Sequence, residues 1–298
     1  MVAGGTAAYG TWAYRAVAQG APAWPFWVGL PFAYLAVPLL FTIIWFAFAW
    51  WFRAARPPDV RLTLPQRIVM FGREFQSLAR SVPRMIFFRL LMPDPAPARA
   101  ELPILLLHGV GCNAGVWAPF RRHLAERGVP AVYGLSYGSF IHSIELFAEE
   151  LDAKLAEIRT ATGASQVVMV CHSMGGLVAR AYLRRYGAAN VRRLVTIGTP
   201  HHGSMHAWLM FGQSLVQMRP GSAWLSELNR SENDAGVPTV SIWSWHDSMV
   251  TPQTSSRIGW GENIVLAGIA HNALLEHPDV WAKVIAEIDR PATSESPA

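Results

Sequence analysis

The sequence has little cysteine and little charge of either sign. Cys112 and Cys171 are its two cysteines among 298 residues, too few for a disulfide framework, and they lack the C-x-x-C spacing of redox or zinc sites. Only 15% of the residues are charged and 52% are hydrophobic, which excludes an intrinsically disordered chain. The length allows two modest domains, or one sizeable α/β domain with an appendage.

Lysine is nearly absent: the chain has two lysines, Lys154 and Lys283, and 23 arginines. Its net charge is +5. The chain has no Lys/Arg-rich run and no aromatic platform of the RNA-binding kind, so nucleic acid is not the expected partner. We expect the excess of arginine to face an anionic bilayer surface instead.

A long uncharged stretch lies near the start of the chain. Residues 16–52 carry no charge, and the 23 residues Leu30–Phe52 are long enough to span a bilayer. Tryptophans at both ends, about 35 Å apart at ~1.5 Å per helical residue, match two interfacial belts. A cleaved signal peptide is the alternative, but the apolar core is too long for one. One membrane-spanning helix is predicted, with a second, shorter pass over residues 2–19 left open.

A basic connector follows the predicted span. The segment Leu64–Leu91 mixes five arginines with four phenylalanines, and two interpretations stay open. The segment is either a helix on a membrane surface or a helix that packs on the rest of the protein and exposes its arginines. A Pro/Ala-rich linker, Pro93–Pro103, ends the connector.

From Pro103 onward, short apolar runs alternate with helical patterns, which indicates a mostly parallel sheet flanked by helices. A helix with its apolar stripe on Ile144, Phe147 and Leu151 lies between the second and third strands, and a last helix buries Val280 and Ile288. The predicted strands are Ile104–Leu107, Ala131–Leu135, Val167–Cys171, Leu194–Ile197, Thr239–Trp243 and Asn263–Ala267.

The third strand runs directly into Cys-His-Ser173-Met174-Gly-Gly and then into a helical pattern. A sharp strand-to-helix turn of this kind lifts a serine hydroxyl above the sheet edge. The segment resembles the nucleophile elbow of the α/β-hydrolase superfamily, with Cys171 in place of the first glycine of G-x-S-x-G. The resemblance implies an α/β-hydrolase fold and a nucleophilic role for Ser173; a serine that merely caps the helix is the alternative.

The first strand is followed by His108-Gly109-Val110, which resembles the oxyanion loop of lipases and esterases. That resemblance implies that the backbone amides of Val110 and Met174 bind the tetrahedral oxyanion. The same loop also fits a dinucleotide fingerprint, Gly109-x-Gly111-x-x-Ala114, but the acid that would hold a ribose is missing after the next strand. No organic cofactor is expected.

Two later strands are followed by the remaining expected partners of the serine. In this superfamily the order is serine, acid, histidine. Asp247 lies in a turn that resembles D-x-x-V-x-P, and Asp234 is the second candidate for the acid. His271 lies in a loop that resembles G-x-x-H-x-x-L, after the last strand. His172 is expected to point away from the nucleophile.

Three further histidines, His201, His202 and His206, suggest a metal site at first sight. No carboxylate or cysteine completes a ligand spacing, so no metal site is predicted. His201 and His202 belong to the segment Thr196–Ser204, which resembles a signature of bacterial triacylglycerol lipases, and His206 follows it. The resemblance covers about 190 residues, from Pro103 to Ile288, in five ordered segments.

An apolar insertion over residues 204–237 is a candidate lid, and a permanently packed cap is the alternative. The predicted organisation is therefore a transmembrane anchor over 1–55, a basic connector over 56–102, an α/β-hydrolase domain over 103–290 and a disordered tail over 291–298. Oligomeric state is not predicted.

These expectations combine into a membrane-anchored serine ester hydrolase, a lipase or carboxylesterase acting on acyl esters through an acyl-enzyme. The alternatives are an acyltransferase on the same scaffold and a catalytically silent scaffold tethered to the membrane. Four arginines soon after the span, against Arg15 ahead of it, predict a cytoplasmic catalytic domain, whereas the resemblance to secreted lipases favours an exported one.

Overall fold

The computed structural model describes residues 2–230 and 236–291. Part of the candidate lid, residues 231–235, lies outside the described residues, and so does the predicted tail apart from Pro291. Asp234, the second candidate for the catalytic acid, is among them.

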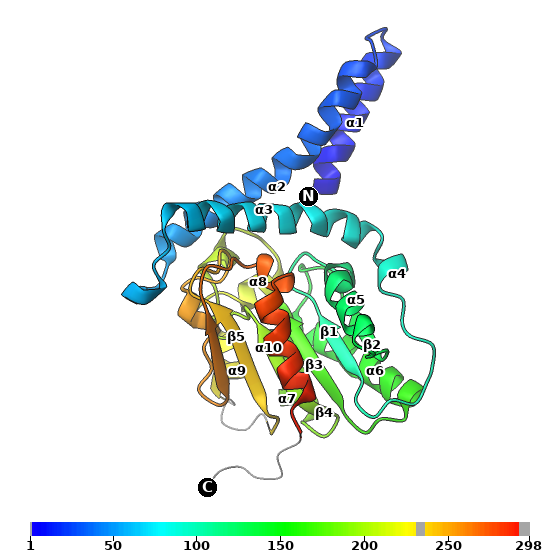
Figure 1. Ribbon diagram of the computed structural model, residues 1–298. Helices are drawn as coiled ribbons and strands as arrows, with labels where there is room; N and C mark the ends of the chain where they lie inside the picture. Colours follow the sequence, from blue (N-terminus) through cyan, green and yellow to red (C-terminus); the bar gives the residue numbers. More distant parts are fainter. Residues whose placement is uncertain (1, 231–235, 292–298) are drawn as a thin grey trace.

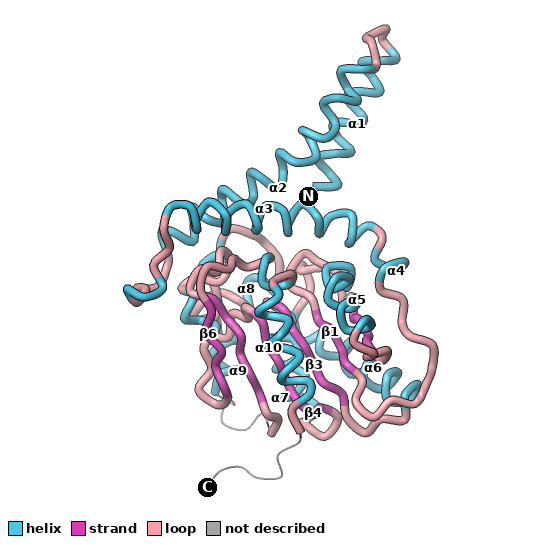
Figure 2. Tube along the Cα trace, in the orientation of Figure 1, coloured by secondary structure: helices cyan, strands magenta, loops and turns pink. Residues whose placement is uncertain are grey.

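A six-stranded parallel sheet forms the centre of the body, in the order β2-β1-β3-β4-β5-β6 (Figure 2). The predicted strands are all present, with ends shifted by at most three residues. The inner strands β1, β3 and β5 are fully buried, as is typical of parallel strands covered on both faces, whereas the edge strand β6 is partly exposed. The strands are β1 (Ile104–Leu107), β2 (Val132–Leu135), β3 (Val167–His172), β4 (Val191–Ile197), β5 (Thr239–Ser244) and β6 (Glu262–Leu266).

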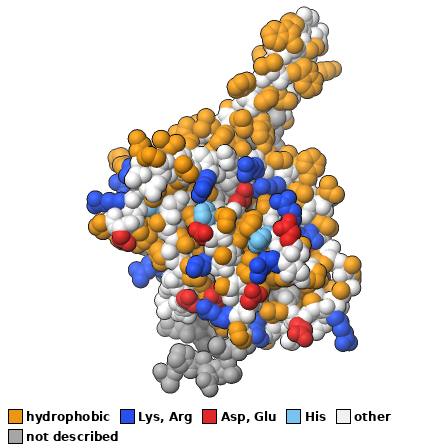
Figure 3. All heavy atoms as spheres, viewed as in Figure 1, with side chains coloured by type: hydrophobic (Ala, Val, Ile, Leu, Met, Phe, Trp, Pro, Cys, Tyr) orange, Lys and Arg blue, Asp and Glu red, His pale blue; other side chains and the backbone are white. Residues whose placement is uncertain are grey.

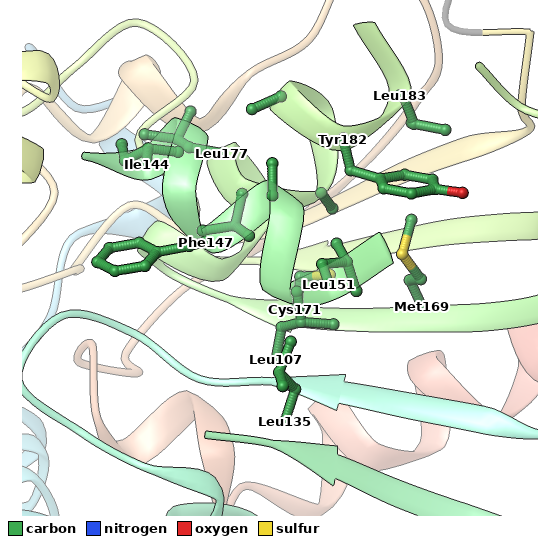
Figure 4. Close-up of a cluster of buried hydrophobic side chains, with 14 of the residues drawn as sticks. Leu107, Leu135, Ile144, Phe147, Leu151, Met169, Cys171, Leu177, Tyr182 and Leu183 are labelled. Carbon is green, nitrogen blue, oxygen red and sulfur yellow. The ribbon is translucent and has the colours of Figure 1, made fainter. Parts of the chain in front are cut away.

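Helices cover both faces of the sheet (Figure 1). On one face, α6 (Ile144–Thr162) and α7 (Met174–Tyr186) pack over a cluster that includes Leu151, Met169 and Tyr182 (Figure 4). On the other face, α5 (Ala118–Glu126) and α10 (Pro278–Asp289) enclose a second cluster. The chain is an α/β fold of three layers, as predicted.

The order in which successive strands cross the sheet reverses at β1, since β2 and β3 lie on opposite sides of β1. In parallel sheets, ligands bind beyond the carboxyl ends of the strands near such a point. The loops after β1 and β3, which carry His108 and Ser173, therefore meet where a site is expected.

Two apolar helices, α1 (Val2–Ala18) and α2 (Trp24–Phe52), form a hairpin that projects from the body (Figure 1). The hydroxyl of Tyr9 donates a hydrogen bond to the carbonyl of Phe26 at 3.0 Å, and the Trp12 and Phe26 rings meet at 4.9 Å. In the described part of the chain, α2 is the one helix whose length and composition suffice to cross a membrane. In Figure 3, hydrophobic side chains cover the hairpin, whereas charged side chains gather on the body.

The connector folds as α3 (Leu64–Ile86) and α4 (Phe88–Leu91), joined to α2 through the 3₁₀ turn Pro58–Val60. Helix α3 begins at Leu64 because Thr63 and Gln66 cap it reciprocally; the Thr63 amide donates to Gln66 Oε1 at 2.8 Å. The helix lies across the end of the body (Figure 1) and buries Glu74, Ser77 and Val82 against it. Of the two interpretations of this segment, packing on the body is therefore observed.

The second half of α2 also packs on the body and on α3. The Tyr34 hydroxyl donates to the Ala79 carbonyl on α3, and the Phe46 and Phe71 rings lie 5.4 Å apart. Trp45 is buried, and its ring contacts that of His206 on the body at 5.5 Å. The apolar hairpin is thus joined rigidly to the edge of the sheet where the candidate site lies.

Candidate active site

Ser173 occupies a strained turn between β3 and α7. Its backbone has φ 54° and ψ −124°, and among the described residues it is the one non-glycine residue with positive φ. Such a conformation costs of order 1–3 kcal/mol and persists where the surrounding structure enforces it. The Ser173 amide donates to the Ile197 carbonyl at 2.9 Å, and its carbonyl accepts from Thr199 Oγ1 at 2.8 Å. This geometry matches a nucleophile elbow.

The two glycines after Met174 make the turn sterically possible. A Cβ on Gly175 would lie 2.8 Å from the carbonyl oxygens of Leu107 and His108, and a Cβ on Gly176 would lie 2.2 Å from Thr199 Oγ1. Both distances are far below contact distance, so only glycine lets α7 approach β1 this closely. The buried Cys171 side chain is accommodated where the usual pattern has glycine.

Asp247 and His271 are brought together after β5 and β6. Asp247 Oδ2 lies 2.8 Å from His271 Nδ1, and both side chains are buried. Asp247 Oδ1 accepts hydrogen bonds from the amides of Met249 and Val250 at 2.8 and 2.7 Å. One carboxylate oxygen of Asp247 therefore holds the backbone of its own loop after β5, called the acid loop below, and the other orients the imidazole of His271.

The surroundings of His271 favour its charged form. Burial alone lowers its pKa, but the charge and hydrogen bond of Asp247, together with the charge of Glu74, outweigh burial and raise the pKa above its usual value. A histidine whose protonated form is stabilised by its surroundings is suited to accept a proton from a serine hydroxyl.

His172, the residue before Ser173, lies beside His271. The two ring centroids are 4.6 Å apart, and His172 Nε2 lies 3.2 Å from the His271 carbonyl oxygen. Burial, then the neighbouring His271 charge, lowers the pKa of His172 well below its usual value. His172 is therefore a neutral support beneath the candidate base.

The loop after β1 comes close to Ser173. A Cβ on Gly109 would lie 2.9 Å from Ser173 Cβ and 3.4 Å from Ser173 Oγ. In the described part of the chain, no acceptor is present for the amides of Val110 and Met174. Two unengaged amides beside a serine hydroxyl can stabilise a developing oxyanion.

Glu74, on α3, belongs to the site but was not predicted from the sequence. Its buried carboxylate accepts four hydrogen bonds, and every donor comes from the loops that carry Asp247 and His271. The donors are Ser248 Oγ at 2.8 Å, the Asn272 amide at 3.1 Å, Asn272 Nδ2 at 2.9 Å and the Ala273 amide at 2.9 Å. Glu74 thus connects both loops to α3, the helix beside the apolar hairpin.

The three further histidines have separate hydrogen-bond partners. His201 lies 3.1 Å from Thr196 Oγ1, His202 lies 3.1 Å from the Arg257 carbonyl, and His206 Nδ1 lies 3.0 Å from Thr251 Oγ1. Within residues 2–230 and 236–291, no group of three or more His, Cys, Asp or Glu side chains is arranged to hold a metal ion.

The insertion after Gly203 packs on the body over most of its described length. Helix α8 (Gln213–Gln217) is tied to α6, since Gln217 Oε1 accepts from the Ile144 amide at 2.8 Å. Helix α9 (Ala223–Arg230) buries Leu225 and Leu228. The segment between β4 and α8 exposes Trp208, Leu209 and Phe211. The described helices thus form a packed cap with an apolar rim.

The comparisons with known proteins agree with this geometry. The family model described as the alpha/beta hydrolase fold matches residues 103–223. A lipase of Bacillus licheniformis in its mature form superposes with a TM-score of 0.56, at 17% identity, over 66% of this chain and 95% of that one. Lipase B of Aspergillus fumigatus gives 0.56 at 19% identity, over 65% and 54% of the two chains.

The body of the chain has the α/β-hydrolase fold, and it is similar in fold to lipases. Curated relatives include triacylglycerol lipases of Pseudarthrobacter phenanthrenivorans and Burkholderia plantarii, each 31% identical over 117 residues, or 37% of this chain. The match spans only about a third of the length of these relatives, 36% and 32%. The family model itself covers part of the body, residues 103–223.

Proposed function

We propose that the chain is a membrane-anchored serine ester hydrolase that acts on acyl esters of lipid-like alcohols. The observation that carries the proposal is the strained backbone of Ser173, at the same sheet edge as the hydrogen-bonded pair of Asp247 and His271. A folded chain keeps a non-glycine residue at positive φ where function requires the side chain.

In the proposed reaction, Ser173 Oγ attacks the ester carbonyl and His271 Nε2 takes the hydroxyl proton. The amides of Val110 and Met174 stabilise the oxyanion of the tetrahedral intermediate. The intermediate collapses, the alcohol leaves with the proton held by His271, and an acyl-enzyme on Ser173 remains. Water then attacks the acyl group with His271 as base, which releases the acid and restores the serine. Asp247 fixes the imidazole tautomer and stabilises its charged form throughout.

Apolar surface near the site supports a lipid-like substrate. Trp208, Leu209 and Phe211 are exposed on the rim of the cap, and the hairpin exposes Trp24, Trp27 and Phe32. Exposed apolar patches of this size mark interaction with membranes or other apolar partners. The names of the curated relatives, triacylglycerol lipases, point to the same substrate class.

The hairpin supports membrane anchoring, and the charges around α2 support a cytoplasmic body. Arg53, Arg56, Arg61 and Arg67 follow α2, whereas Arg15 alone precedes it. Carbonate extraction should leave the full chain in the membrane fraction, and release into the supernatant would contradict anchoring. A fluorescent protein fused after Ala298 should be bright and an alkaline phosphatase fusion inactive; the reverse would show an exported body.

An acyltransferase on the same scaffold is the second candidate. A pig protein named 1-acylglycerol-3-phosphate O-acyltransferase is 34% identical over 92 residues, or 29% of this chain and 26% of its own. In that reaction an alcohol, rather than water, would attack the acyl group on Ser173.

A series of p-nitrophenyl esters from acetate to palmitate tests the proposal on the full chain in detergent. We expect kcat/KM to rise with acyl length beyond acetate; a maximum at acetate would contradict the lipid-like substrate. Adding a monoacylglycerol acceptor separates the two reactions. A hydrolase releases free fatty acid in the presence of the acceptor, whereas an acyltransferase yields mainly acylated acceptor.

A further inference from the structure

A cavity of about 790 Å³ lies at the junction of the hairpin, the connector and the acid loop. Its volume is in the range of ligand-binding pockets, roughly 300–1,000 Å³. Phe46, Trp50 and Phe71 form an apolar wall, and Asp247 and Ser248 lie on the side of the body. This interfacial cavity reaches the candidate acid Asp247, but neither Ser173 nor His271 lines it.

Four arginines also line the interfacial cavity: Arg53, Arg56, Arg61 and Arg67. In the part of the chain that the structure describes, no salt bridge joins any of them to a carboxylate. Arg53 donates to the Trp50 carbonyl at 2.8 Å and stacks over the Trp50 ring, while Arg67 donates to the Leu62 carbonyl at 3.1 Å. The buried Nε of Arg56 has no partner within the same residues.

The two buried carboxylates on this side of the candidate site, Asp247 and Glu74, are already engaged. Asp247 is shared between His271 and two backbone amides, and Glu74 accepts its four hydrogen bonds from the loops of the body. Burial, and then the positive charges of Arg53 and Arg67, lowers the pKa of Arg56 to about 10. The cavity therefore gathers four guanidinium groups, and within the described residues none of them forms a salt bridge.

We propose that the interfacial cavity binds the phosphate group of an anionic phospholipid. Guanidinium groups form paired, charge-assisted hydrogen bonds with phosphate oxygens. The apolar wall of Phe46, Trp50 and Phe71 offers a surface for the glycerol backbone and the first methylenes of the acyl chains. The cavity opens where α2 leaves the proposed membrane span, which is the depth of lipid headgroups. The proposal rests on the membrane anchoring and is independent of ester hydrolysis.

Native mass spectrometry of the full chain in detergent, titrated with dioleoyl phosphatidylglycerol or dioleoyl phosphatidylcholine, tests this site. We expect the wild type to retain one phosphatidylglycerol with an affinity at least tenfold above that for phosphatidylcholine. R56Q/R67Q should weaken phosphatidylglycerol binding at least tenfold, and R56K/R67K, which keeps the charge, should weaken it far less.

The matched control is R89Q/R99Q, which removes two exposed charges from the connector outside the cavity. It should bind phosphatidylglycerol as the wild type does. Equal loss in both double variants would show diffuse attraction instead of a site, and unchanged binding by R56Q/R67Q would overturn the proposal. If millimolar inorganic phosphate displaces phosphatidylglycerol from the wild type, the cavity prefers a soluble phosphate to the lipid, and the proposal is overturned. Unchanged near-ultraviolet circular dichroism of each variant establishes that the fold is retained.

Discussion

Glu74 on α3 accepts two hydrogen bonds from Asn272, the residue after His271: one from the backbone amide at 3.1 Å and one from the side-chain amide at 2.9 Å. A carboxylate that is fully buried requires such donors, because an unpaired charge in the interior is costly. The position of the candidate base therefore depends on a helix outside the hydrolase body.

Glu74→Gln tests this dependence. The amide has two donors of its own, so it cannot accept all four hydrogen bonds. We expect a loss of about 2–3 kcal/mol in the free energy of unfolding, measured by denaturant titration. We also expect kcat to fall more than tenfold. Because the charge of Glu74 helps to raise the pKa of His271, the acid limb of kcat/KM should move to lower pH.

The pH shift separates positioning from simple destabilisation. Glu276→Gln is the control. Glu276 forms a salt bridge with Arg84, which lies on α3 as Glu74 does, but Glu276 has no hydrogen bond to Asp247 or His271. It should lower stability with little change in the pH profile. Identical pH profiles for Glu74→Gln and the wild type would contradict a role for Glu74 at the site.

Asp247→Asn and the neighbouring His246→Ala should differ sharply. Asp247→Asn leaves His271 in the wrong tautomer, and kcat should fall by ~10⁴-fold. His246 Nδ1 accepts from the Gly268 amide at 3.0 Å, so His246→Ala should cost about 1 kcal/mol of stability and leave at least a tenth of kcat. Steady-state kinetics on a p-nitrophenyl ester decides the ranking; the reverse order would exclude Asp247 as the acid.

Gly175→Ala and Gly72→Ala should have opposite effects on stability. A Cβ at Gly175 meets two backbone carbonyls of β1 and its loop, whereas a Cβ at Gly72 on α3 meets nothing within 4 Å. Gly175→Ala should destabilise by ~1–3 kcal/mol or more through overpacking. Gly72→Ala should stabilise by about 0.5–1 kcal/mol by improving helix propensity. Equal effects in thermal melts would contradict the close packing of α7 on β1.

Buried neutral histidines should make the fold sensitive to mild acid. Burial lowers the pKa of His108, His206 and His246 to about 4. A histidine with a lowered folded-state pKa contributes stability above its unfolded pKa, near 6.5, and that stability is lost as pH falls toward 4. His271, with a raised pKa, acts in the opposite sense and loses its contribution as pH rises. The melting temperature should therefore drop between pH 6.5 and 4, and His206→Gln should make the drop shallower; an unchanged slope would contradict this account.

Much of the body could be predicted because its signals are local. Buried parallel strands appear as short apolar runs, and β1 begins and ends at the predicted residues, Ile104 and Leu107. The turn at Ser173 could be predicted because it joins an apolar strand to a helical pattern and is followed by Gly175 and Gly176. The arrangement of Asp247 beside His271 follows from the order of strands in the sheet, once the loops after β5 and β6 are identified.

Glu74 could not be predicted in the same way, because its partners lie about 174–199 residues away in the sequence. One local signal existed: Glu74 is the only acidic residue in the arginine-rich segment 64–91. The sequence leaves a second pass over residues 2–19 open because Gly4, Gly5 and Gly10 lower the helix propensity of this segment. Contacts such as Trp12 on Phe26 offset that weakness in the structure.

Labelling with a fluorophosphonate probe tests the central claim, that Ser173 is the nucleophile of a serine hydrolase. The full chain in detergent should gain one covalent phosphonyl group, and peptide mapping should locate it on Ser173. Ser173→Ala should abolish the label and His271→Ala should slow labelling by orders of magnitude, whereas Cys171→Ala should retain it. A folded wild-type chain that takes up no label, or takes it up at another serine, would contradict the assignment.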